Sequence, residues 1–285
     1  AAAVWSRHLR GDRVAGGFDV GAHWFTLPWQ RLEPGAFADA ALGGITGPLE
    51  PGLLALVALY VVAGAAEARR RGGLDRGLLG TSALFAAVAM LAPDSYMNTA
   101  AFAARWLPEA LALLVLAVPP PAFRPGLLRG LAVTGFLLFV LASSAAWVVF
   151  DDEDLAGFDA ALSAIPDRAR VVGLSFTRHS SVIKGHVFEQ MFAYAQVVHG
   201  GSLNFSFALH GSSLVRYRGV RIEPFTSAFE EHPERFSRRD LAFFDVALVN
   251  GPPALHERLS HLSGFVPVTA RGPWRLYRLE PAGPR

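Results

Sequence analysis

The sequence predicts a membrane all-α helical bundle of about four transmembrane helices, followed by a small extracytoplasmic α/β domain. Residues 131–150 contain no charge, and four acids follow directly at positions 151–154. About 20 apolar residues are what an α-helix needs to cross the hydrocarbon core of a bilayer. The composition is divided in the same way, because 52% of the 285 residues are hydrophobic, only 18% are charged, and the hydrophobic excess lies before position 150.

Residues 1–48 contain no apolar run that is long enough to span. Trp24, Phe25 and Trp29 lie close together here, and aromatic rings of this kind favour the membrane–water interface. We expect an extracytoplasmic or interfacial loop with short helices, and an ordinary loop packed on its neighbours is an open alternative. Because the chain starts without an initiator Met, we also expect it to be the C-terminal part of a longer protein.

Four apolar runs define the transmembrane region, residues 49–150. The third run is long enough to span only if its helix starts near Ala100, which brings Arg105 and Glu109 towards the membrane. The expected spans are residues 49–66, 77–92, 100–118 and 131–150.

Arginines in the loops predict the orientation of these spans, since cytoplasmic loops are enriched in Arg and Lys. The loop after the first span carries four Arg and the loop after the third carries two, whereas the loop between the second and third contains only Arg105. The first and third spans then run inward. We expect a multi-pass protein of the bacterial inner (cytoplasmic) membrane, with its C-terminal domain on the periplasmic side.

Residues 151–285 alternate between short apolar runs and helical patterns, which predicts a soluble α/β domain with a partly parallel sheet. The expected helices are residues 155–165, 184–198 and 253–262. The expected strands are residues 170–176, 203–209, 214–220, 245–249, 265–269 and 274–279.

The composition excludes several classes of function. The chain has no cysteine, so it has neither a disulfide framework nor a thiolate metal site. Its net charge is +2, and no basic patch is interleaved with aromatic residues, so we expect no nucleic-acid partner. The nucleotide patterns G-x-G-x-x-G and Walker A do not occur, nor does the hydrolase pattern G-x-S-x-G, and no cofactor is identified.

His186 and Glu189 lie three residues apart on a predicted helix, a spacing that can bind a metal. No HExxH pattern or nearby Asp pair accompanies them, so a divalent metal is unsupported by the sequence. His179, His199 and His210 lie in the same part of the domain, and polar surface histidines are the expected alternative.

Polar residues around the loop between the second and third spans form the candidate substrate-binding site. They are Asp94, Tyr96, Arg105 and Glu109. Ionisable groups at membrane depth are costly, so they tend to be paired or functional. Arg105 and Glu109 are four residues apart, hence on one helical face, and can pair. The guanidinium of Arg105 suits the phosphate of a lipid-linked substrate, and the alternative is an interfacial Arg beside a carboxylate.

Several stretches carry a family resemblance by their pattern and order. In chain order they are AARWLPEALALLVLA, IPDRARVVGLSF, FAYAQVVHGGSLNFSFA, LVRYR, FDVALVNG and GPWRLYRLE. Over residues 49–285 the chain resembles the C-terminal part of bacterial multi-spanning membrane glycosyltransferases of the GT-C type, the dolichyl-phosphate-mannose–protein mannosyltransferase-like class. No diagnostic catalytic motif is included in the resemblance.

The resemblance implies a hexosyltransferase that takes a sugar from a polyprenyl-phosphate donor, with that donor and membrane lipid as its partners. In this class the catalytic acid lies in the first extracytoplasmic loop, which we expect upstream of this chain. No residue is therefore assigned a catalytic role, and Asp19 is not at the matching place. Arg105 is carried over as a contact to the donor phosphate, and the soluble domain is expected to assist acceptor binding or stability.

Two alternatives come from other classes of protein. One is a non-catalytic membrane protein whose extracytoplasmic domain binds a glycan or a partner protein. The other is a transporter fragment, which is the weakest of the three because, apart from Glu109 in the third span, no span carries a charge near its midpoint, where transported ions and substrates usually bind.

The predicted orientation is tested with reporter fusions. A reporter fused after Arg71 should lie in the cytoplasm, and the same reporter fused after Asp154 should lie outside it, because the arginine-rich loop holds the first end inside. Paired alkaline phosphatase and green fluorescent protein fusions measure the side. Two fusions that report the same side would refute the orientation.

Overall fold

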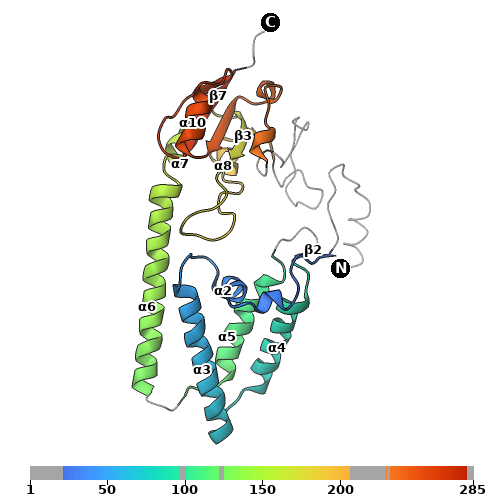
Figure 1. The fold of residues 1–285 in the computed structure, drawn as a ribbon, viewed down its shortest axis with the longest axis vertical. Helices are drawn as coiled ribbons and strands as arrows, with labels where there is room; N and C mark the ends of the chain where they lie inside the picture. Colours follow the sequence, from blue (N-terminus) through green and yellow to red (C-terminus); the bar gives the residue numbers. More distant parts are fainter. Residues whose placement is uncertain (1–21, 97–100, 122–124, 206–228, 230–231, 281–285) are drawn as a thin grey trace. The chain divides into compact units, whose positions relative to one another are not determined.

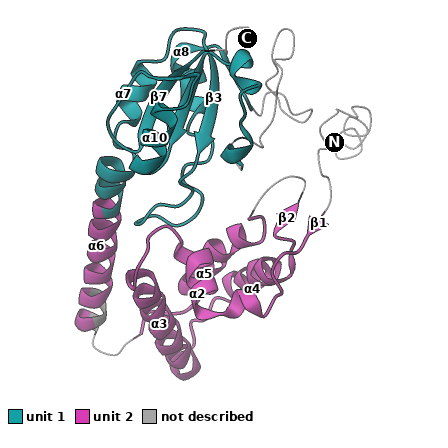
Figure 2. Ribbon diagram, turned by 45° about the horizontal axis from the view of Figure 1, so that its top comes forward, with its two compact units in different colours: residues 1–16, 146–285 teal, residues 17–145 magenta. Residues whose placement is uncertain are grey.

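The computed structural model describes residues 22–96, 101–121, 125–205, 229 and 232–280. The chain divides into two compact units (Figure 2). The helical unit comprises residues 17–145, and the α/β unit comprises residues 1–16 and 146–285. The boundary falls within one long helix, α6 (Pro125–Val149).

Helices of the helical unit pack side by side. Figure 1 shows α3, α4 and α5 next to one another, with α2 across the end at which α3 begins. Ala41, Ala89 and Leu107 bury a small core where α2, α4 and α5 meet. The elements before α6 are β1 (Ala22–His23), η1 (Gln30–Leu32), α2 (Pro34–Leu42), α3 (Leu49–Arg71), α4 (Arg76–Leu91), β2 (Ser95–Tyr96), η2 (Ala104–Trp106) and α5 (Leu107–Ala117).

Among the described residues, two helices are long and apolar enough to cross a membrane. One is α3, and the other runs from Gly130 to Asp154, where the π-helical turn η3 (Phe150–Asp154) continues α6. Only 11% of each apolar window is buried, so neither is the covered core helix of a soluble protein. Exposed apolar surface of this extent marks contact with lipid or with protein. These helices occupy the first and fourth predicted spans, and four transmembrane helices are not shown.

The helix predicted over residues 100–118 is too long. α5 begins only at Leu107, and its 11 residues extend about 16 Å, roughly half of the ~30 Å hydrocarbon core. Pro108 explains the late start, because a proline ring inside a helix clashes with the carbonyl four residues earlier and is tolerated only in the first turn. The second predicted span corresponds to α4, whose 16 residues extend about 24 Å.

A short connection turns the chain from α3 into α4. Gly72 ends α3 at φ 78°, where a residue with a Cβ is strained. Asp75 then caps α4 by accepting hydrogen bonds from the N–H groups of Gly77 (2.9 Å) and Leu78 (3.0 Å). Its own N–H donates to the carbonyl of Ala117 (3.0 Å), which ties the connection to the end of α5.

The α/β unit contains a mixed five-stranded sheet in the order β4-β3-β5-β7-β6. β3 is parallel to β4 and to β5, whereas β7 is antiparallel to β5 and to β6. The partly parallel sheet predicted from the sequence is therefore confirmed. The strands are β3 (Arg170–Ser175), β4 (Ser202–Leu203), β5 (Val246–Asn250), β6 (Phe265–Pro267) and β7 (Trp274–Leu279).

Both faces of this sheet are buried. Along a strand, successive side chains point to opposite faces. Val171 belongs to a core shared with α7 (Phe158–Ser163) and α8 (Ala193–His199), and its neighbour Val172 belongs to a second core shared with α10 (Pro253–Ser260). Continuous apolar runs such as that of β5 are what a strand covered on both sides requires.

Several predicted boundaries in the α/β unit need correction. The helix predicted over residues 184–198 is wrong for its first half, and only α8 forms. Gly185 and Gln190 have φ angles of 90° and 60°, and left-handed residues of this kind interrupt an α-helix. The helix over residues 155–165 shortens to α7, preceded by Gly157 at φ 84°. β7 matches its prediction, while most of residues 203–209 and all of residues 214–220 lie outside the described residues.

A tryptophan of β7 holds the turn in which the acids lie. The N–H of the Trp274 indole donates to the carbonyl of Asp154 (2.9 Å), and the Trp274 ring packs on Phe158. The four acids are therefore part of the helix end η3, rather than a separate linker.

Gly173 in β3 is tested by substitution with alanine. A Cβ there would lie 2.3 Å from the ring of Phe192, so Gly173→Ala should lower the free energy of unfolding by about 1–3 kcal/mol. Thermal unfolding of the full chain in detergent measures it. The cost should shrink in combination with Phe192→Ala, because the ring atoms that the new Cβ strikes, Cγ and Cδ1, are removed. Additive effects of the two substitutions would contradict this contact.

Candidate functional site

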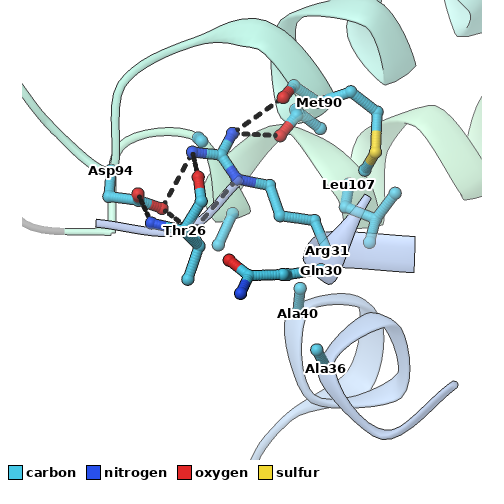
Figure 3. Close-up of a pocket in the computed structure, with 11 residues that line it drawn as sticks. Thr26, Gln30, Arg31, Ala36, Ala40, Met90, Asp94 and Leu107 are labelled. Carbon is cyan, nitrogen blue, oxygen red and sulfur yellow. Dashed lines mark hydrogen bonds and ion pairs between the residues drawn. The ribbon is translucent and has the colours of Figure 1, made fainter. Parts of the chain in front are cut away.

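Arg31 lies at the carboxyl end of α4. Its Nη1 donates hydrogen bonds to the carbonyl oxygens of Ala89 (3.0 Å) and Met90 (3.0 Å) (Figure 3). It also donates to the carbonyl oxygen of Ala92 (2.8 Å). The last carbonyls of a helix lack partners within it and carry the negative end of the helix dipole. A guanidinium at this place satisfies several of them at once.

Asp94 binds the other side of the same guanidinium. Its Oδ1 lies 3.0 Å from Nη2 of Arg31, and their side chains are only 23% and 10% exposed. Its carboxylate also accepts hydrogen bonds from the N–H groups of Phe25 (2.7 Å) and Thr26 (2.8 Å) and from the Thr26 hydroxyl (2.7 Å). The aromatic loop before η1 is thereby fixed to the segment that follows α4.

The pKa of Asp94 lies below its usual value of 3.8. Burial acts in the opposite direction and raises this pKa, but it is outweighed. The hydrogen bonds from Thr26 and Phe25, together with the positive charge of Arg31, favour the ionised carboxylate. Asp94 is therefore a charged residue at neutral pH.

A cavity of about 180 Å³ opens beside this ion pair. Arg31, Asp94 and Gln30 give it a polar side, as the close-up in Figure 3 shows. Much of the remaining wall consists of small residues: Ala36, Ala40, Ala89, Ala103 and Ala104. The space is suited to a small group that is polar at one end, and the arrangement supplies binding contacts rather than a pair of catalytic acids.

The other predicted site residues lie at the same end of the helical unit. Tyr96 is in β2, paired with Ala22 of β1, and its ring lies 5.6 Å from that of Phe102. Arg105 is exposed in η2, and Glu109 is exposed in the first turn of α5. Residues on either side of Arg105 line the cavity, although Arg105 itself does not.

Arg105 has another interaction, and among the described residues no ion pair joins it to Glu109, a pairing that the sequence allowed. The reason is the chain between them. Arg105 belongs to the 3-10 turn η2 and Glu109 to the α-helix that follows, so the four-residue spacing of a continuous helix does not apply.

Arg31 and Thr26 were missed by the sequence interpretation. The loop between positions 22 and 32 contains one charged residue, and an isolated charge among Trp24, Phe25 and Trp29 needs a partner at an interface. The isolated charge therefore indicates that Arg31 has a partner, but the sequence does not show which carboxylate of the chain, here Asp94, is that partner.

The histidines of the α/β unit have structural partners. His199 contacts Asp167 (3.1 Å) and the carbonyl of Leu162 (2.9 Å). His186 lies 3.4 Å from Glu189, and its ring is 4.9 Å from that of His179. Within the described residues, no group of three or more His, Asp or Glu side chains is placed to hold a metal. His210 lies outside those residues.

A buried histidine supports β7 from α10. His256 lies between the Tyr277 hydroxyl (3.0 Å) and the Pro273 carbonyl (2.8 Å). Burial lowers the pKa of His256, because the charged ring loses its hydration, and burial raises the pKa of Tyr277 for the same reason. The pair remains neutral and structural at neutral pH.

Ligands of α/β sheets usually bind at the carboxyl ends of parallel strands. Ser175 and Asn250 lie there, at the ends of β3 and β5. Both side chains donate to one backbone carbonyl, that of Thr177, at 2.9 and 3.3 Å. They therefore hold the loop after β3, and the stronger candidate site is the one in the helical unit.

No protein-family model, curated protein sequence or solved structure matches this chain. The resemblance to GT-C glycosyltransferases therefore stays a hypothesis.

The network at the end of α4 is tested with Arg31→Ala. The substitution removes charge-assisted hydrogen bonds and should lower the free energy of unfolding by about 1.5–3 kcal/mol, measured by thermal unfolding in detergent. Folding lowers the pKa of Asp94, so the ionised carboxylate stabilises the folded state. This stabilisation is complete above pH 3.8 and is lost as the pH falls below 3.8. The variant should lose less stability than the wild type in that window.

Arg76→Ala is the matched control, since Arg76 is exposed at the opposite end of α4. The unfolding temperature of Arg76→Ala should equal that of the wild type. Equal unfolding temperatures for Arg31→Ala and Arg76→Ala would show that the network does not support the unit.

Proposed function

We propose that this chain is part of an integral membrane glycosyltransferase that takes a sugar from a polyprenyl-phosphate-linked donor. The observation that carries the proposal is the position of Arg105. It is exposed directly before the apolar helix α5, at the end of the helical unit that also holds the cavity and the Arg31–Asp94 pair. A guanidinium at this position can bind a phosphate at the membrane surface, because its N–H groups donate charge-assisted hydrogen bonds to phosphate oxygens.

The proposed membrane placement uses α3, α4, α5 and α6 as four spans of the bacterial inner membrane. α3 and α6 have the required length, and the shorter α4 and α5 are accommodated by local thinning and by the packing of α4 on α5 and of α5 on α3. The end with Arg69, Arg70 and Arg71 is cytoplasmic in this proposal. The Asp94 end and the α/β unit are extracytoplasmic.

The candidate site residues have different roles in the proposal. Arg105 contacts the donor phosphate. Tyr96 and Glu109, both exposed, border the same end and contact the sugar hydroxyls. Asp94 is a positioning residue, because Arg31, Thr26 and Phe25 already occupy its oxygens. The general base is supplied by an earlier extracytoplasmic loop of the full-length protein, as the family resemblance implies.

A second candidate is a non-catalytic membrane protein whose α/β unit binds a partner protein. The observation in its favour is the exposed apolar face of α8. Tyr194, Val197 and Val198 are 53%, 80% and 57% exposed, and their spacing places them on one face of this helix. In this case the residues around Arg105 contact only lipid head groups.

Transfer assays separate the two candidates. Membranes that contain the full-length protein are given radiolabelled polyprenyl-phosphate mannose or glucose, and label in water-soluble or protein acceptors is measured. Arg105→Ala should reduce transfer by about tenfold or more, since one charge-assisted phosphate contact is worth about 1.5–3 kcal/mol.

Arg69→Ala is the control, because Arg69 is exposed at the opposite end of the helical unit. It should transfer at the wild-type rate. Transfer that is unchanged in Arg105→Ala removes this residue from the site. No transfer by the wild-type protein with either donor, despite correct insertion, supports the non-catalytic candidate.

A further inference from the structure

An apolar groove lies between α3 and the first part of α6. Its volume is about 480 Å³, and it is lined by six residues of α3, by Val115 of α5 and by four residues of α6. Gly135 is one of them, and a Cβ there would lie 3.6 Å from the side chains of Leu53 and Leu56. The volume falls in the range of about 300–1,000 Å³ that holds small ligands. Apart from the hydroxyl of Tyr60 the lining side chains are apolar, so a hydrocarbon chain suits the groove.

One end of this groove is basic. α3 ends with Arg69, Arg70 and Arg71, and Figure 1 shows that α6 begins at that end of the helical unit. Arg70 follows the lining residue Ala63 by seven positions, a spacing that keeps both on one face of a helix. Arg69 follows Ala63 by six positions and points away from that face. The groove face therefore continues into Glu67, Arg70 and Arg71, which follow Ala63 by four, seven and eight positions.

Arg70 and Arg71 differ in their partners. Nε of Arg71 lies 2.8 Å from the carboxylate of Glu67, whose side chain is only 13% exposed. Arg70 is exposed, and no ion pair of Arg70 occurs among the described residues. Because Arg71 engages the Glu67 carboxylate, Arg70 is the guanidinium on this face that has no ion pair among the described residues.

We infer that this groove binds an anionic phospholipid, with one acyl chain between α3 and α6 and the phosphate at Arg70. The inference rests on the membrane placement of the proposed function and not on its transferase chemistry. Basic pockets between membrane helices on the cytoplasmic side bind anionic lipid head groups, and a guanidinium binds phosphate oxygens through charge-assisted hydrogen bonds.

Charge complementarity favours this occupant over another apolar helix. An apolar helix from a second copy of the chain fills the groove with side chains, but it brings no anion to the Arg70 guanidinium. The lipid also lies in the inner leaflet, because the arginine-rich end is the cytoplasmic one. It is therefore a different ligand from the sugar donor, which the Arg105 end binds.

Native mass spectrometry of the full chain tests the inference. The protein, purified in detergent, is incubated with phosphatidylglycerol or phosphatidylcholine at equal concentration. Wild type should retain phosphatidylglycerol about tenfold more strongly, and Arg70→Ala should remove this preference. Arg69→Ala is the matched control and should keep it. Gly135→Leu should weaken binding of both lipids, because its side chain fills the groove.

Several outcomes overturn the inference. Equal retention of the two lipids by the wild type does so, and so does an equal loss in Arg69→Ala and Arg70→Ala. Unchanged binding by Gly135→Leu with a wild-type unfolding temperature removes the groove as the site. Dimers that exclude lipid, or complete displacement of phosphatidylglycerol by polyprenyl phosphate at equal concentration, assign the groove to another occupant.

Alkaline carbonate extraction distinguishes this failure from failure of the proposed membrane placement. A protein released from membranes at high pH is not integral, which overturns the placement and the inference together. A protein that stays in the membrane pellet but shows no lipid preference overturns the inference alone. Sugar transfer is measured separately and changes neither result.

Discussion

The contact of Arg31 with the end of α4 and with Asp94 is the interaction on which the helical unit depends. One guanidinium satisfies three carbonyl oxygens and a carboxylate, and that carboxylate in turn holds the N–H groups of Phe25 and Thr26. The loop before α2, the end of α4 and the start of β2 meet at this point. Because the small core of Ala41, Ala89 and Leu107 lies close by in the same elements, the polar network and the apolar contacts fix the same arrangement. The cavity beside Asp94 exists because the alanines in its wall leave space between these elements unfilled.

The α/β unit is stabilised differently, because two apolar cores cover the two faces of its sheet. Its charged pair, Arg170 with Asp245, is about half exposed at the amino ends of β3 and β5. The hydrogen bond of Asp245 with Arg170 lowers the pKa of Asp245, although burial acts against it. Exposed pairs of this kind contribute little free energy, so burial of strand residues such as Val172 and Leu248 supplies most of the stability.

The sequence predicts those features that arise from local patterns. The apolar runs of α3, α6, β5 and β7 were identified because burial on a helix or strand repeats with a fixed period. The helix over residues 184–198 failed because Gly185 and Gln190 have left-handed φ angles, and a glutamine in the sequence gives no sign of one. Of the candidate site residues, Asp94 lines the cavity and Arg105 does not. The pairing of Arg31 with Asp94 gives no local pattern, because it joins segments that are far apart in the chain.

The surroundings of the helical unit decide how strong the Arg31–Asp94 pair is. Only 11% of each long apolar window is buried, so the unit does not cover its own apolar surface in the way that the α/β unit does. Exposing apolar side chains to water is unfavourable, and an apolar solvent such as the bilayer removes this free-energy cost. At the edge of such a solvent the dielectric constant is lower than in water, which strengthens satisfied charge-assisted hydrogen bonds and makes an unsatisfied charge more costly. In the proposed membrane placement, the partners of Arg31 therefore matter more than they do in bulk water, because a cation at a membrane edge is costly without them.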